Sequence, residues 1–192
     1  MINRYANTPR LVLGFHGCEK KVADDIINLK REMIPSTNDY DWLGHGFYFW
    51  ENDPNRALEF AKKNNKLEPA VIGAVIDLGN CLSLMERSTI QLLQASYTNL
   101  LKVSQQQDQL LPENTGDRNG HKLIRRLDCA VFENLHNLLN KAIKSAYDYD
   151  TVVGAFFEGA PAYNGTEIKE QSHIQICVRN INCIKGFFYP LK

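Results

Sequence analysis

Neither sign of charge is in excess in this 192-residue sequence, because 22 Lys and Arg residues balance 22 Asp and Glu residues. A net charge of zero gives no global electrostatic reason to bind nucleic acid or a membrane, although a local basic patch stays possible. No run approaches the ~20 apolar residues that span a bilayer, and the first residues lack the apolar core of a signal peptide. We therefore expect a cytoplasmic protein without a membrane partner.

The sequence also lacks a Cys-x-x-Cys pair, since none of its five cysteines, an odd number, has that spacing to another. Most of the five lie inside apolar runs, which favours buried, reduced thiols of the kind found in a cytosol. Without a pair at ligand spacing, the sequence predicts no metal site. Internal repeats and linker-like segments are lacking too, and 192 residues are enough for one sizeable core. We therefore expect residues 1–192 to form a single domain.

Hydrophobic periodicity predicts a mixed set of strands and helices. Residues 104–120 are polar and predict a loop, and residues 179–182 predict the turn of a hairpin between the last two strands. Asp53 and Pro54 have the chemistry of a helix N-cap and first helical residue. The sum is an α+β domain with helices inserted between early and late strands. We expect strands over 10–15, 43–50, 70–77, 151–157, 173–178 and 183–189, helices over 20–30, 53–62 and 86–103, and one long helix or two over 122–145.

Two short segments near the start of the chain carry the most informative residues. In residues 11–17 an apolar strand ends in His16 and Gly17, and in residues 43–50 a Gly-x-Gly bend leads into Tyr48. Together they resemble the NAD-binding core of the ADP-ribosyltransferase fold, in the branch shared by diphtheria toxin and the poly(ADP-ribose) polymerases. The resemblance implies a split β-sheet core around an NAD cleft.

The resemblance implies a role in NAD binding for several residues. Gly17 would let the backbone approach the nicotinamide carboxamide, whose donor and acceptor pair with main-chain groups. His16 would hydrogen-bond a ribose hydroxyl, and the Tyr48 ring, entered through Gly46, would stack on the nicotinamide face. Phe60 would form the second wall of the nicotinamide slot. The alternative is that His16 is a satisfied core histidine and that the two aromatic rings are ordinary packing.

The third motif of the family departs from its usual form in this sequence. The family places a catalytic glutamate on a late strand, and the matching position in residues 169–178 is Gln175. A glutamine amide oxygen can accept a hydrogen bond from a ribose hydroxyl, but it lacks the charge that stabilises an oxocarbenium-like transition state. Glu170 or Glu158 could supply the missing carboxylate. Alternatively, Gln175 is only a polar residue on an edge strand, and the site has no catalytic third residue.

Residues 158–171 lie where the family has its target-recognition loop. The segment is polar and contains Gly, Pro and Asn, and functional loops are the usual place for specificity. We expect Glu158, Tyr163 and Glu170 to take part in recognition of the acceptor. Tyr163 would be an exposed aromatic ring that contacts it.

Two weaker signals lie beside the first motifs. Arg56 follows Tyr48 on the expected second helix and could contact the NAD pyrophosphate, but a solvated helix face is the ordinary reading of an arginine there. Asp41 and Trp42, next to the Gly-x-Gly bend, could close one wall of the pocket.

The resemblance implies a mono-ADP-ribosyltransferase that cleaves NAD and transfers ADP-ribose to a macromolecular acceptor, with His16, Tyr48 and Gln175 as catalytic residues. Small transferases of this kind resemble bacterial toxins of toxin–antitoxin or phage-defence systems, so an antitoxin partner follows from the resemblance alone. The acceptor could be protein, RNA or DNA. The alternatives are an NAD glycohydrolase on the same fold and a catalytically silent module that binds NAD or ADP-ribose.

Overall fold

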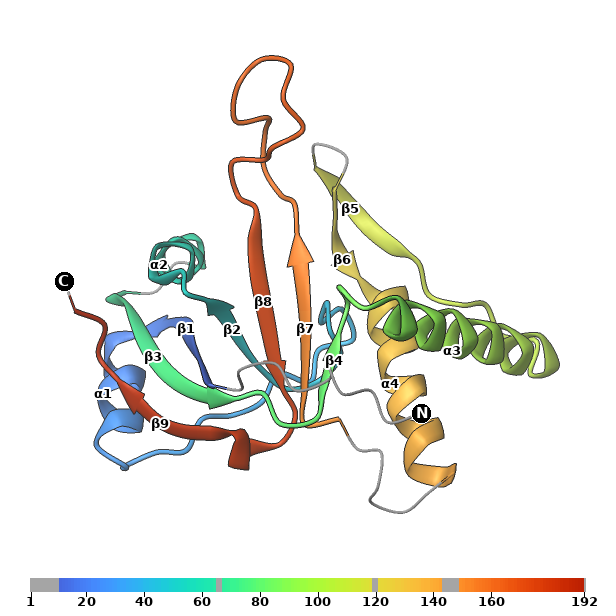
Figure 1. The fold of residues 1–192 in the computed structure, drawn as a ribbon, viewed down its shortest axis with the longest axis horizontal. Helices are drawn as coiled ribbons and strands as arrows, with labels where there is room; N and C mark the ends of the chain where they lie inside the picture. Colours follow the sequence, from blue (N-terminus) through green and yellow to red (C-terminus); the bar gives the residue numbers. More distant parts are fainter. Residues whose placement is uncertain (1–10, 65–66, 119–120, 143–148, 192) are drawn as a thin grey trace.

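The computed structural model describes residues 11–64, 67–118, 121–142 and 149–191. Within these residues the chain forms a seven-stranded sheet, a separate two-stranded sheet and four α-helices (Figure 1), so the predicted α+β class is confirmed. The elements are β1 (Leu11–Glu19), α1 (Lys20–Ile27), β2 (Phe47–Glu51), α2 (Pro54–Lys63), β3 (Pro69–Asp77), β4 (Cys81–Ser83), α3 (Arg87–Gln106), β5 (Asn114–Arg118), β6 (His121–Arg125), α4 (Arg126–Ala142), β7 (Thr151–Phe156), β8 (His173–Val178), a 3-10 turn (Ile181–Cys183) and β9 (Ile184–Phe188).

The large sheet has the strand order β4-β7-β8-β2-β1-β3-β9. Neighbouring strands in this sheet are antiparallel, except β4 and β7, which pair in parallel. β1 pairs with β3 along its full length, from Leu11 opposite Asp77 to Glu19 opposite Pro69. β1 and β2, in contrast, pair only at two positions, where Gly14 faces Glu51 and Phe15 faces Trp50. The sheet therefore has two halves, β4-β7-β8-β2 and β1-β3-β9, joined over a short stretch.

The hairpin expected between the last two strands is wrong. β8 lies between β7 and β2, so both of its edges are already paired. The chain instead passes through the 3-10 turn and adds β9 to the free edge of β3, as Figure 1 shows at the lower left. A short connection suggested a hairpin, but strand partners far away in the sequence decided the pairing.

The middle of the chain also differs from the expectation. The segment 104–120, expected to be a loop, begins with the last turn of α3 and contains β5, which pairs with β6. The expected helix over 122–145 begins only at Arg126, because residues 121–125 form β6. Residues 143–145 lie outside the described residues, and the short strand β4 was not predicted.

Local chemistry explains how α2 is placed beside the first two strands. Asp53 caps the helix, since its side chain accepts a hydrogen bond from the backbone N–H of Arg56 at 2.9 Å, and Pro54 begins it, so both predictions are confirmed. The helix lies directly against β1 at Gly17, where an added Cβ would be 2.0 Å from the carbonyl oxygen of Ala57. Only glycine allows this close approach.

The core lies between the strands and the helices that cover them. Phe49, Ile76 and Ile176 are among its fully buried side chains. Burial raises the pKa of the Cys177 thiol to about 12, so this thiol stays protonated. The expected burial of the cysteines is confirmed for Cys18, Cys129, Cys177 and Cys183, whereas Cys81 is half-buried.

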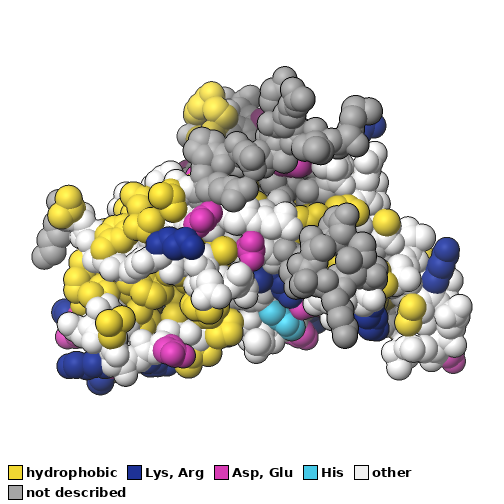
Figure 2. Space-filling model, turned by 60° about the horizontal axis from the view of Figure 1, so that its bottom comes forward, with side chains coloured by type: hydrophobic (Ala, Val, Ile, Leu, Met, Phe, Trp, Pro, Cys, Tyr) yellow, Lys and Arg dark blue, Asp and Glu magenta, His cyan; other side chains and the backbone are white. Residues whose placement is uncertain are grey.

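The surface is not uniform. Figure 2 shows the bottom of the molecule, where hydrophobic side chains gather over the half that contains α1, β1, β3 and β9. Leu11 and Leu13 of β1 are among the large apolar side chains that are exposed. No helix in the described part of the chain is long and apolar enough to cross a membrane.

Candidate functional site

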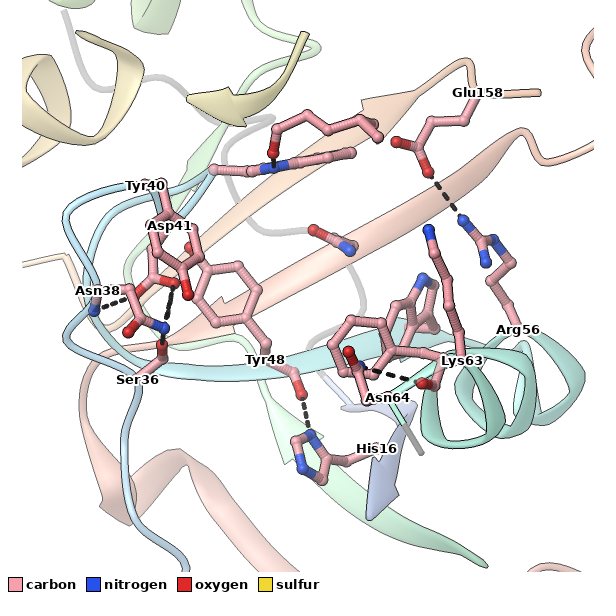
Figure 3. Close-up of a pocket in the computed structure, with 15 residues that line it drawn as sticks. His16, Ser36, Asn38, Tyr40, Asp41, Tyr48, Arg56, Lys63, Asn64 and Glu158 are labelled. Carbon is pink, nitrogen blue, oxygen red and sulfur yellow. Dashed lines mark hydrogen bonds and ion pairs between the residues drawn. The ribbon is translucent and has the colours of Figure 1, made fainter. Parts of the chain in front are cut away.

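A pocket of about 460 Å³ opens beside the junction of the two sheet halves. Eight residues that the sequence singled out line it; five of them were expected to catalyse, bind NAD or recognise the acceptor, and these come from β1, β2, α2, the segment after β7, and β8. Figure 3 shows the pocket with Ser36, Asn38, Tyr40 and Asp41 on one side and, on the other, Arg56 and Lys63 of α2 with the C-cap residue Asn64. These five residues are His16, Tyr48, Phe60, Glu158 and Gln175, and the other three are Asp41, Trp42 and Arg56.

Four other predicted residues do not line the pocket. Gly17 packs against α2, and an added Cβ at Gly46 would lie 2.5 Å from the carbonyl oxygen of Val178. Both glycines are therefore required by close backbone packing, and their role toward NAD stays a prediction. Tyr163 and Glu170 are exposed in the segment between β7 and β8.

His16 and Tyr48 are linked across β1 and β2. Because a carbonyl oxygen only accepts, the 2.9 Å contact between His16 Nδ1 and the backbone oxygen of Tyr48 requires that Nδ1 carries the proton. The Tyr48 hydroxyl donates to the carbonyl oxygen of Gly44 at 2.6 Å and accepts from the N–H of Leu43 at 2.8 Å. Burial raises the pKa of Tyr48, so the phenol stays neutral. The Tyr48 ring is thereby fixed as a wall of the pocket, with its hydroxyl already used.

Two residues that the sequence did not single out hold the bend before Tyr48. Glu133 on α4 accepts hydrogen bonds from the backbone N–H of His45 at 2.8 Å and from Arg179 Nη1 at 2.7 Å. Arg179 Nη1 also donates to the carbonyl oxygen of His45 at 3.0 Å. Burial alone would raise the pKa of Glu133, but the bonds from Arg179 and His45 and the Arg179 charge hold it below its ordinary value. No local pattern signals this cluster, because Glu133 and Arg179 lie 88 and 134 residues from His45.

The wall beside Tyr48 is built by a hydrogen-bonded loop. Asp41, which is buried, accepts at Oδ1 from Ser36 Oγ at 2.9 Å and at Oδ2 from the N–H of Asn38 at 3.0 Å. The pKa of Asp41 is raised above its ordinary value, because the effect of burial exceeds the lowering effect of these hydrogen bonds. Trp42 donates from Nε1 to the carbonyl oxygen of Leu123 at 3.1 Å. The prediction that Asp41 and Trp42 close a pocket wall is confirmed, since both line the pocket.

The opposite wall contains an ion pair. Arg56 Nη2 lies 2.8 Å from Glu158 Oε2, and the two side chains are only 16% and 9% exposed. The solvated-face reading of Arg56 is therefore wrong, whereas a contact with the NAD pyrophosphate stays a prediction. Glu158 and Glu170 were the two carboxylates that could replace the glutamate missing at position 175. Glu158 lines the pocket, and Glu170 does not.

Gln175 lies in the middle of the large sheet. Its strand partners are Trp50 on β2 and Gly154 on β7, so the alternative that it lies on an edge strand is wrong. Its side-chain amide makes no hydrogen bond within the described residues, and it lines the pocket. The amide is therefore available to a ligand.

Aromatic side chains form the floor of the pocket beside α2. The rings of Trp50 and Phe60 have centroids 5.1 Å apart, and both line the pocket. Phe60 is 42% exposed, which is compatible with a ring that a ligand can cover. Trp50, Lys63 and Asn64 were not predicted as site residues; Trp50 lies in a predicted strand, whereas Lys63, at the end of α2, and Asn64, its C-cap, lie beyond the predicted helix 53–62.

No protein-family model, no curated protein and no solved structure matches the chain. In the described ranges, no group of three or more His, Cys, Asp or Glu side chains is arranged to hold a metal ion. The absence of a metal stays a prediction.

Proposed function

We propose that this chain is a mono-ADP-ribosyltransferase that cleaves NAD and transfers ADP-ribose to a macromolecular acceptor. The observation that carries the proposal is the convergence of His16, Tyr48 and Gln175 on one pocket from three strands. The short pairing of β1 with β2, next to that pocket, supports the split core that the resemblance implies.

In the proposed reaction NAD lies in the pocket with nicotinamide between Tyr48 and Phe60. His16, oriented by its bond to the Tyr48 backbone, holds a ribose hydroxyl, and the backbone at Gly17 binds the carboxamide. The amide oxygen of Gln175 accepts a hydrogen bond from the ribose as nicotinamide leaves. The acceptor then attacks C1″ of the ribose.

The acceptor would approach along the segment 158–171, which stands clear of the sheet at the end of β7 and β8 (Figure 1). Protein, RNA and DNA stay equal candidates for the acceptor. A role as a bacterial toxin, an antitoxin partner and a cytoplasmic location rest on the family resemblance alone.

Two other functions fit the same pocket, and the uncharged residue at position 175 favours the first of them. A glutamine stabilises a ribosyl cation less than a glutamate does, which suits a module that binds NAD or ADP-ribose without cleaving it. A glycohydrolase, in which water is the acceptor, would need no acceptor loop.

The test is incubation of the protein with a cell lysate and NAD labelled in its adenylate phosphate. We expect label in protein or nucleic acid, and much less of it with the Gln175→Ala variant. Label only in free ADP-ribose would establish the glycohydrolase instead, and calorimetric NAD binding without cleavage would establish the silent module. A protein that neither binds nor cleaves NAD overturns the proposal.

A further inference from the structure

Among the described residues, two carboxylates line the pocket, Asp41 and Glu158. Asp41 is already hydrogen-bonded within its own loop. Asp41 Oδ1 accepts from Ser36 Oγ at 2.9 Å and from Asn38 Nδ2 at 3.4 Å, and Oδ2 accepts from the N–H of Asn38 at 3.0 Å. With both oxygens bonded inside the loop, Asp41 maintains the shape of the wall.

Glu158 differs because only one of its two carboxylate oxygens accepts a hydrogen bond. Oε2 accepts from Arg56 Nη2 at 2.8 Å, whereas Oε1 accepts no hydrogen bond from any residue that the structure describes. The side chain is 9% exposed, so its charge is largely removed from bulk water. Oε1 is not among the buried unpaired side-chain atoms of the described residues, so it keeps contact with the solvent in the pocket and is open to a ligand or water.

Arg56 fixes where this carboxylate points. Its backbone N–H is bonded to the capping Asp53, in the first turn of α2, and its side chain crosses from the helix to Glu158 (Figure 3). The same helix carries Phe60 into the pocket. Glu158 is therefore tied to the element that forms the proposed nicotinamide slot.

Glu158 also stands on the acceptor side of the pocket. In the pairing of β7 with β8, Gln175 faces Gly154, and Glu158 follows Gly154 by four residues toward the loop. The backbone oxygen of Glu158 accepts from the N–H of Gln171 at 3.0 Å, which closes the base of the segment 158–171. An acceptor guided by this segment would meet Glu158 before it meets Gln175.

From this placement we infer that Glu158 is the general base of the transfer and that Arg56 is its positioning residue; the inference rests on the proposed function. The bond between C1″ and the nicotinamide nitrogen breaks, and its electron pair leaves with the nicotinamide, which becomes neutral. An oxygen or nitrogen of the acceptor forms a bond to C1″, and its proton passes to Glu158 Oε1 and then to water. Gln175 supplies a hydrogen bond to the ribose, and Glu158 supplies the carboxylate that position 175 lacks.

The test measures nicotinamide release from NAD by the full chain, with water as the acceptor, for the parent and for Glu158→Gln. Glutamine keeps the shape and a bond to Arg56 but takes up no proton. We expect release to fall about 100-fold or more, while the Kd for NAD changes less than threefold. The matched control is Glu167→Gln, which makes the same carboxylate-to-carboxamide change at an exposed residue of the same segment. It should keep the parent rate.

Sodium azide distinguishes a lost base from a distorted pocket. Azide is an anion that attacks C1″ without losing a proton, so it should restore nicotinamide release in Glu158→Gln and give ADP-ribosyl azide by mass spectrometry. It should not restore Gln175→Ala. A parent rate in Glu158→Gln, or no restoration by azide, overturns the assignment of Glu158. A parent that releases no nicotinamide either in water or with a cell lysate overturns the proposed function, and the inference with it.

The role of Arg56 is tested by measuring, for each Arg56 variant, both kcat for nicotinamide release and the Kd for NAD. Arg56→Met should lower the rate of nicotinamide release while NAD affinity is retained, and Arg56→Lys should recover part of that rate. A large loss of NAD affinity with an unchanged rate at saturation would instead make Arg56 a contact of the pyrophosphate.

Discussion

The two walls of the pocket differ in how completely their polar groups are paired. The Asp41 wall, residues 36–48, has its carboxylate and the Tyr48 hydroxyl bonded within the wall itself. The Glu158 wall, formed by Arg56, Glu158 and Gln175, keeps a carboxylate oxygen and a side-chain amide without a partner in the described residues. Paired polar groups maintain a shape, whereas unpaired ones are available for chemistry.

Buried atoms near the Glu158 wall extend this contrast. Four buried side-chain atoms of the described residues have no hydrogen-bond partner: Trp50 Nε1, Arg56 Nε and His173 Nε2 near the Glu158 wall, and His136 Nε2 on α4 behind the Asp41 wall. The rings of Trp50 and His173 have centroids 6.3 Å apart. Burial lowers the pKa of His173, so its ring is neutral, and Nδ1 donates to the carbonyl oxygen of Gln171 at 2.7 Å. The comparison therefore predicts that changes in the Glu158 wall alter turnover and that changes in or behind the Asp41 wall alter stability.

The largest effect is expected for Gln175→Ala. If the amide oxygen stabilises the ribosyl transition state, turnover should fall on the order of 100-fold. NAD affinity should change much less, because the interaction strengthens only as the bond breaks. Initial rates of nicotinamide release and calorimetric NAD titrations measure the two quantities.

Gln175→Glu is the matched variant for this prediction. It restores the carboxylate that the family usually has and should keep activity, with more hydrolysis of NAD by water. Full activity in a folded Gln175→Ala protein would leave the third motif without support. It would also contradict the prediction that changes in the Glu158 wall alter turnover.

The second effect is one of stability and concerns His136, behind the Asp41 wall on α4. Burial, then the charge of Arg179, lowers the pKa of His136 to about 4, against the smaller raising effect of Glu133. The folded state therefore binds this proton more weakly than the unfolded state, so stability is complete above about pH 6.5 and falls as the pH decreases toward 4.

Urea denaturation at pH 7 and pH 5 measures this loss. Between these values the parent should lose about 2 kcal/mol through His136, and His136→Leu should remove that part of the pH dependence. The pKa of Glu133 is lowered, so its contribution is lost only at more acidic pH and separates from that of His136. An identical pH dependence in parent and variant would contradict the assignment.

The parts of the site that follow from local patterns could be predicted from the sequence. The strands that carry His16, Tyr48 and Gln175 are short apolar runs, and the Asp53 cap places α2 beside them. Their meeting in one pocket requires that β1, β2 and β8 are neighbours in one sheet, and the resemblance implied a strand core around a cleft.

The parts that depend on distant partners could not be predicted. Arg56 meets Glu158 across 102 residues, and Glu133 meets His45 across 88. Nothing near Glu158 in the sequence distinguishes it from Glu170, yet one lines the pocket and the other is exposed. The β8–β9 hairpin failed for the same reason, since the partners of β8 come from β2 and β7.

A third, smaller effect separates the two functions of Tyr48. Tyr48→Phe keeps the ring but leaves the N–H of Leu43 and the oxygen of Gly44 without the hydroxyl, which should cost about 1 kcal/mol of stability. NAD affinity should be retained. Tyr48→Ala also removes the ring, and the loss of stacking should weaken NAD binding by about 1 kcal/mol, roughly fivefold in Kd. Unchanged NAD affinity in a folded Tyr48→Ala protein would make the ring a packing residue only.

The smallest effect is expected outside both walls, at Tyr163. Its side chain is 63% exposed in the segment 158–171, where the backbone hydrogen bond from Ala162 to Ile168 and the bridge between Pro161 and Lys169 give the segment an ordered shape. An exposed aromatic ring on such a support contributes contact area to a partner at little entropic cost. Tyr163→Ala should therefore reduce labelling of the acceptor several-fold and leave NAD affinity and nicotinamide release unchanged. Tyr163→Phe should keep most of the labelling, and Tyr97→Ala on α3 serves as the control for loss of an exposed tyrosine elsewhere. Labelling that is equal in Tyr163→Ala and the parent would move acceptor recognition away from this ring.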